Sequence, residues 1–129
     1  MTLLLDTCAL LWLAEAPAKL SQKARALIAS PTANLVVSAI SAFEVGVKSR
    51  KGKLDLKHTP EDWWLIATTH HGICVIDVSD SIALASTALP AIHADPCDRI
   101  VIATAREIRA TILTSDPLIA KYAEAAVVW

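Results

Sequence analysis

The chain of 129 residues has few glycines and cysteines, and no apolar run long enough to cross a membrane. Its 3 glycines form no glycine-rich loop that could cradle a phosphate. Its 3 cysteines, Cys8, Cys74 and Cys97, form no CxxC pair for zinc or redox chemistry, and their apolar neighbours predict reduced thiols in the core. No apolar run reaches the roughly 18 residues of a membrane span, and Met1 leads directly into an apolar stretch. These absences favour a cytoplasmic protein.

Positive charge is not in excess but is unevenly placed. The net charge is -1, so the chain as a whole has no basic footprint for nucleic acid. Four cations nevertheless fall within six residues, at Lys48, Arg50, Lys51 and Lys53. Two interpretations stay open: a solvated helix end, where cations are favoured by the dipole, or an edge that contacts RNA phosphates.

Short apolar runs alternate with helical segments along the chain, of which 54% is hydrophobic. The runs predict buried parallel strands, and the alternation implies βαβ units with helices on both faces of the sheet. The strands are expected at 3–5, 35–37, 73–76 and 111–114, with a fifth at 126–128. Residues 1–129 are therefore predicted to form a single domain with a central, mostly parallel sheet of 4–5 strands.

Four acids stand close to the beginnings of helices, namely Asp6, Glu44, Asp98 and Asp116. Asp6, Glu44 and Asp116 come after strands, and the carboxyl ends of parallel strands meet at one edge of a sheet, where α/β proteins place their ligands. A loop precedes the helix of Asp98, so this acid joins the others only if the loop folds back over the same edge.

Helix capping is the alternative explanation for each acid taken alone. Asp95-Pro96 and Asp116-Pro117 are good helix starts, and Ser41 to Glu44 has the pattern of a capping box. Four carboxylates at one edge would repel one another, however, and they could not all stay ionised without a counter-charge. A hard divalent cation, Mg²⁺ or Mn²⁺, would supply that charge and could activate water for phosphodiester hydrolysis.

Four segments, in order, resemble the signatures of PIN-domain ribonucleases, in particular the VapC-like toxins of bacterial toxin–antitoxin pairs. The segments are Leu3-Leu4-Leu5-Asp6-Thr7, Ser38-Ala39-Ile40-Ser41-Ala42-Phe43-Glu44, His93-Ala94-Asp95-Pro96-Cys97-Asp98-Arg99 and Leu113-Thr114-Ser115-Asp116. The resemblance covers essentially the whole chain. It implies a three-layer α/β/α, Rossmann-like PIN fold and a metal-dependent endoribonuclease. Such toxins are typically homodimers, held inactive by a small VapB-like antitoxin.

The resemblance also implies roles for individual residues. Asp6 and Asp98 would be the principal Mg²⁺ ligands, Glu44 would complete the acidic cluster, and Asp116 would be a fourth acid that acts more often through water. Asp95 matches the first acid of the family's Asp-Pro-x-Asp-Arg pattern, and we interpret it as a helix cap next to the metal ligands, with direct contact to the metal as the alternative.

For the polar residues next to the acids, the sequence predicts less specific roles. Thr7 and Ser115 could orient waters, although hydroxyls at helix starts are more often caps. Arg99 is expected to pair with Asp95, with a contact to substrate phosphate as the alternative. His93 is expected to be structural rather than a general base.

The adjacent Trp63 and Trp64 lie about 100° apart on a helix, so they cannot both face one core. We expect one of them to contact a partner subunit or the antitoxin.

Two other function classes are alternatives to the nuclease. One is a non-catalytic module that keeps the fold and uses its acidic groove to bind a basic partner peptide; retention of all four acids argues against it. The other is a phosphotransfer or phosphatase domain with Asp6 as nucleophile. The chain lacks the second Asp two residues after Asp6 that a haloacid-dehalogenase-type motif would need, and it has no phosphate loop.

Overall fold

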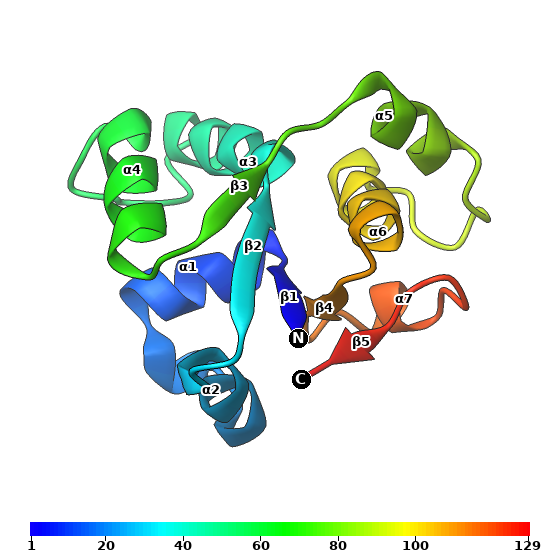
Figure 1. Ribbon diagram of the computed structural model, residues 1–129. Coiled ribbons are helices and arrows are strands. Elements are labelled where there is room, and N and C mark those ends of the chain that lie inside the picture. Colours follow the sequence, from blue (N-terminus) through cyan, green and yellow to red (C-terminus); the bar gives the residue numbers. More distant parts are fainter.

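One parallel sheet runs through the centre of the molecule (Figure 1). The structure, a computed structural model, describes residues 1–129. Its five strands are β1 (Thr2–Leu5), β2 (Asn34–Ser38), β3 (Cys74–Ile76), β4 (Thr111–Leu113) and β5 (Val127–Val128). They lie in the order β3-β2-β1-β4-β5, and every neighbouring pair is parallel. The predicted strands, including the fifth, are therefore confirmed.

Seven α-helices and one 3₁₀ turn connect the strands. They are α1 (Thr7–Glu15), the 3₁₀ turn η1 (Pro17–Lys19), α2 (Gln22–Ala29), α3 (Ala39–Arg50), α4 (Pro60–His70), α5 (Asp80–Thr87), α6 (Pro96–Ile108) and α7 (Pro117–Ala120). Each α-helix begins at a residue whose side chain accepts a hydrogen bond from a free backbone N–H group of the first turn. Ser21 begins α2, and Thr59 begins α4 with Pro60 in the first turn.

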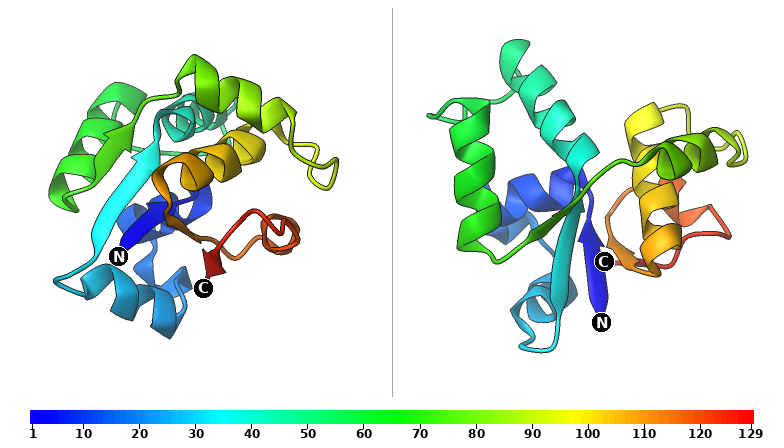
Figure 2. Two further views of the ribbon diagram at one scale, coloured as in Figure 1. Left: turned by 45° about the vertical axis from the view of Figure 1, so that its right-hand side comes forward. Right: turned by 45° about the horizontal axis from the view of Figure 1, so that its top comes forward.

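The helices cover both faces of the sheet, which gives three layers. Alternate residues of β1 face opposite layers, because successive side chains of a strand point to opposite faces. Leu3 and Leu5 pack in one core with α1, α2, α3 and α4, whereas Leu4 packs in a second core with α6 and α7. The right-hand view of Figure 2 shows the two helical layers on either side of the sheet. The predicted α/β/α architecture is confirmed.

The edge of the sheet departs from the expectation of burial on both faces. Strands β1, β2 and β4 are largely buried, but β3 is an edge strand whose Cys74 and Val75 are exposed. The prediction of three core thiols is also wrong, since Cys8 and Cys74 are exposed and Cys97 is half-buried. A thiol needs little volume, so apolar neighbours in sequence do not determine its burial. None of the helices is long and apolar enough to span a membrane.

Strand β1 is the point at which the chain changes direction across the sheet. The chain adds β2 and β3 on one side of β1 and then returns to add β4 and β5 on the other. In open α/β sheets, ligands bind at such a switch point, outside the carboxyl ends of the strands. Asp6 directly follows β1 at this place.

Candidate active site

A polar pocket of about 400 Å³ lies at the carboxyl ends of the central strands. We call it the acid pocket. Five carboxylates line it (Asp6, Glu44, Asp95, Asp98 and Asp116), together with Lys48, the hydroxyl residues Thr7 and Ser115, and Cys8 and Pro117. All four predicted acids and Asp95 therefore come together. The loop before α6 does fold back over this edge, as the placement of Asp98 required.

Asp6 is the most deeply placed of these acids, at 6% exposed. Its Oδ1 accepts a hydrogen bond from Ala9 N (2.8 Å) and so caps α1, while Oδ2 accepts one from the Thr114 hydroxyl. Burial raises the pKa of the Asp6 carboxyl, although the bonds from Thr114 and Ala9 oppose this effect. Asp6 is thus both a cap and a member of the cluster, so the capping explanation and the functional one both apply to it.

Glu44 is held by a hydroxyl from another helix. Thr7 Oγ1 donates to Glu44 Oε1 (2.5 Å) and lies 2.8 Å from Ser41 Oγ. The capping-box interpretation is wrong, because Ser38 caps α3 through Ile40 N and Ser41 is fully buried within the helix. Thr7 is not a cap either, since it orients Glu44. Burial is the main reason that the pKa of the Glu44 carboxyl is raised.

Asp98 projects from the first turn of α6, whose N-cap is Asp95. Asp95 Oδ1 accepts from Cys97 N (2.8 Å), so its predicted capping role is confirmed. Burial, together with the nearby charges of Asp95 and Glu44, raises the pKa of Asp98 to about 7. The pocket therefore holds more negative charge than it can stabilise alone.

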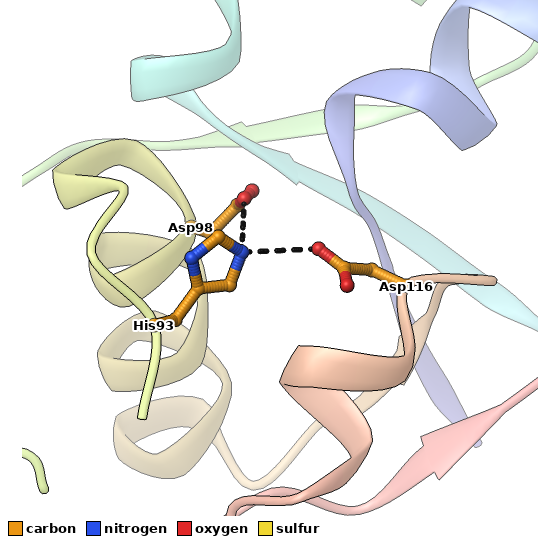
Figure 3. Close-up of side chains that lie close together, drawn as sticks. All are labelled: His93, Asp98 and Asp116. Carbon is orange, nitrogen blue, oxygen red and sulfur yellow. Dashed lines mark hydrogen bonds and ion pairs between the residues drawn. The ribbon is translucent and has the colours of Figure 1, made fainter. Parts of the chain in front are cut away.

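His93 bridges two of the acids (Figure 3). Its Nε2 lies 2.9 Å from Asp98 Oδ2 and 3.0 Å from Asp116 Oδ2. The backbone N–H of Asp95 donates to its Nδ1 (3.2 Å), so Nδ1 is the acceptor and Nε2 carries the hydrogen that faces both carboxylates. His93 was expected to be structural, and it has the more specific role of holding two of the acids of the pocket.

Arg99 does not pair with Asp95, so that prediction is wrong. Its guanidinium donates instead to the carbonyl oxygens of Leu89 (2.8 Å), Pro90 (2.8 Å) and His93 (3.3 Å). An arginine has five N–H donors in one plane, and the loop before α6 presents several free carbonyls to it. The carboxylate of Asp95 accepts a hydrogen bond from the backbone N–H of Cys97 instead, at the start of α6.

The basic residues divide between the acid pocket and its surroundings. Lys48 lines the acid pocket, and Lys51 and Lys53 line an adjoining hollow. Arg50 is exposed at the end of α3 and lines neither. Ser115 lines the acid pocket and is exposed to solvent.

Two hydroxyl residues that the sequence argument did not single out support the site. Thr114 Oγ1 donates to Asp6 and accepts from Asp116 N (3.0 Å), so it ties two acids together. Tyr122 Oη accepts from His93 N (2.8 Å) and from Arg99 Nη1 (3.2 Å), and it donates to Pro90 O (3.0 Å). Thr114 could have been found from the sequence, because it directly follows the apolar end of β4 and comes shortly before an acid. No local sequence pattern marks Tyr122 as part of the site.

The donors in the acid pocket suit a hard divalent cation. Carboxylate oxygens are the ligands that Mg²⁺ and Mn²⁺ prefer, and burial with mutual repulsion raises the pKa of three of these acids. A bound cation would offset that repulsion. One ligand atom from each of His93, Asp98 and Asp116 can be chosen so that all three lie within 4.8 Å of one another.

Comparison with known proteins places this geometry in a family. The family profile of the PIN domain matches residues 3–125. Ribonuclease VapC22 of Mycobacterium tuberculosis is 32% identical over 116 residues, which are 89% of this chain and 87% of that protein.

Solved structures give the same picture of the fold. A toxin–antitoxin complex from Klebsiella pneumoniae contains a chain with 26% identity and a TM-score of 0.65, and the match covers 98% of this chain and 95% of that one. VapBC2 from Rickettsia felis, bound to a DNA fragment from its promoter, has a TM-score of 0.75 at 15% identity, over 99% of this chain and 98% of that one. The second likeness concerns the fold alone.

Proposed function

Because the chain belongs to the PIN-domain family, we propose that it is a metal-dependent endoribonuclease and the toxin of a toxin–antitoxin pair. The convergence of five carboxylates on one pocket carries the proposal. Similarity to a named ribonuclease and to chains of toxin–antitoxin complexes supports it. Residues 1–129 would act as one domain in the cytoplasm, as a homodimer with a VapB-like antitoxin as its inhibitor.

Asp6 and Asp98 would be the principal ligands of Mg²⁺, or of Mn²⁺ in its place. Glu44 and Asp116 would complete the set, directly or through water. When bound there, such a cation would lower the pKa of water and would offer a counter-charge to the scissile phosphate.

The chain's own residues orient the acids. Thr114 fixes the Asp6 carboxylate, Thr7 fixes Glu44, and His93 holds Asp98 and Asp116 at a constant separation. Asp95 begins α6 and so sets the direction of Asp98. Lys48, Arg50, Lys51 and Lys53 would attract the RNA backbone toward the pocket.

Cleavage of RNA by the purified protein tests the proposal. Asp6→Asn and Asp98→Asn should each lower cleavage with Mg²⁺ about 100-fold or more, because even an outer partner of a metal site is typically worth 10–100-fold. Asn also caps helices well, so Asp6→Asn should keep α1 and the fold. EDTA should abolish cleavage by the wild type.

Asp80→Asn is the matched control, because Asp80 is an exposed acid in the first turn of α5, outside the acid pocket. It should cleave like the wild type. Full activity of Asp6→Asn or Asp98→Asn would refute the assigned site. A folded wild type, free of antitoxin, that cleaves no RNA would favour the module that binds a basic peptide in the same groove.

A further inference from the structure

A second hollow, of about 200 Å³, adjoins the acid pocket along α3. We call it the basic pocket, and it is lined by Phe43, Val47, Lys51, Lys53 and Cys97, and by three residues that also line the acid pocket, namely Glu44, Lys48 and Asp95. The two hollows therefore form one continuous surface, on which a single extended ligand could lie across both.

The lysines of the basic pocket have no carboxylate partner. The ion pairs of the molecule both involve His93, with Asp98 and Asp116. Lys48 stands four residues after Glu44 on the same helix, the spacing at which such pairs commonly form, yet Glu44 receives its hydrogen bond from Thr7. Three ammonium groups thus remain free to bind an anion beside the acids.

Phe43 adds an aromatic surface at the same place. Its side chain is 61% exposed, and it stands directly before Glu44 on α3. An exposed phenyl ring beside free cations has the composition of a site for single-stranded nucleic acid, in which bases stack on aromatic rings and cations track the phosphates.

We propose that the basic pocket binds one unpaired nucleotide next to the scissile phosphate of the RNA substrate. Its base stacks on Phe43, and its phosphate contacts Lys51 and Lys53. This inference rests on the proposed ribonuclease function and deepens it, because it assigns one nucleotide of the substrate to named residues beside the acids. Bases of an A-form duplex are stacked on one another and are not free to stack on the protein, so this contact requires an unpaired base.

Binding of a short single-stranded RNA in EDTA, measured by fluorescence anisotropy, separates this contact from cleavage. Phe43→Leu should weaken binding about tenfold, the size expected for the loss of one base–aromatic stack. Phe43→Tyr keeps the aromatic face and should bind within about twofold of the wild type. A duplex of the same sequence should bind weakly, and Phe43→Leu should leave its affinity unchanged.

An oligonucleotide series with one abasic position locates the nucleotide. The wild type should lose affinity at one position above all, and in Phe43→Leu the same abasic site should cost nothing more. Leu84→Ala is the control, because Leu84 is 70% exposed on α5, away from both pockets. It should bind RNA like the wild type.

Three results would overturn the inference: wild-type affinity in Phe43→Leu, equal losses in Phe43→Leu and Leu84→Ala, or unchanged RNA binding with weakened protein association in Phe43→Leu. The last result would make the face a protein interface. Failure of the ribonuclease proposal is distinguishable, since it appears as intact RNA with the wild-type protein, whatever the binding data show.

Discussion

At the scale of single residues, Thr114 shows how the site depends on neutral groups. Thr114 is 1% exposed, and its hydroxyl donates to the Asp6 carboxylate and accepts from the backbone N–H of Asp116. One hydroxyl therefore sets the position of two acids from different parts of the chain. Removing it would leave a buried carboxylate without its partner, which typically costs about 1–3 kcal/mol or more.

Asp98 makes stability depend on pH. Burial, Asp95 and Glu44 raise its pKa from 3.8 to about 7, with Asp6 adding to the effect and His93 opposing it. A carboxyl with a raised pKa binds its proton more tightly when folded, so its stabilising contribution is complete below about pH 4 and is lost as the pH rises through about 7.

In EDTA, the wild type should melt at a lower temperature at pH 8 than at pH 5. We expect a difference of about 4 °C or more, which corresponds to about 1 kcal/mol in a domain of this size. Asp98→Asn should flatten this dependence, Asp80→Asn should keep it, and Mg²⁺ should raise the melting temperature at pH 8. A wild-type melting temperature that increases from pH 5 to pH 8 in EDTA would contradict the assignment.

At the scale of elements, the loop between α5 and α6 positions the site although it has no regular structure. From α6, the guanidinium of Arg99 donates to carbonyl oxygens of this loop. Tyr122, which follows α7, forms hydrogen bonds with the loop backbone at His93 and Pro90. The loop is thus fastened to two elements on the same side of the sheet. Its fixed course allows His93 to reach Asp98 and Asp116.

Tyr122→Phe should lower kcat for RNA cleavage with little change in KM, because the loop would hold His93 less firmly while the RNA-binding surface stays intact. It should also lower the free energy of unfolding by about 1–3 kcal/mol, since buried donors lose their acceptor. Steady-state cleavage well below the melting temperature gives the first quantity, and urea unfolding gives the second.

Thr104→Val is the control, because it removes a fully buried hydroxyl that binds only Ile100 O within α6. It should lose stability without losing kcat. Equal losses of kcat in the two variants would show that Tyr122 acts through stability alone.

The strands and the acids could be predicted from the sequence because their signals are local. The apolar run before Asp6 and the Thr59-Pro60 start each occupy a few residues and act at close range. The partners of Arg99 could not be predicted, since the loop carbonyls that accept its hydrogen bonds come together only when the loop before α6 has folded. Tyr122 was missed for the same reason: it lies 29 positions from His93.

At the scale of the whole molecule, α4 carries two adjacent apolar residues that are exposed, Leu65 and Ile66. Trp63 is buried and donates from Nε1 to Glu15 Oε1 (2.6 Å), whereas Trp64 is half-buried beside Leu65 (65% exposed) and Ile66 (52% exposed). Both tryptophans nevertheless pack on the same core, Trp63 within it and Trp64 against it, so the prediction that they cannot both face one core is wrong. Contact of Trp64 with a partner stays a prediction.

Trp64→Ala should weaken self-association or binding of the antitoxin by about 2 kcal/mol or more, the cost typical of a tryptophan at the centre of an interface. Sedimentation of the free protein and titration with the antitoxin measure the two affinities. Leu84→Ala, on the other helical layer, should change them less. Unchanged affinities in Trp64→Ala would remove this residue from the interface.

The central position of β1 also has a consequence for biosynthesis. Strand β1 leaves the ribosome well before its neighbour β4, and the acid pocket joins Asp6 to Asp116, which is made much later. A nascent chain can assemble β1, β2 and β3 early, but its acid cluster stays incomplete until β4 and Asp116 have emerged. The order of translation thus delays the chemistry of the site until this later segment has been made.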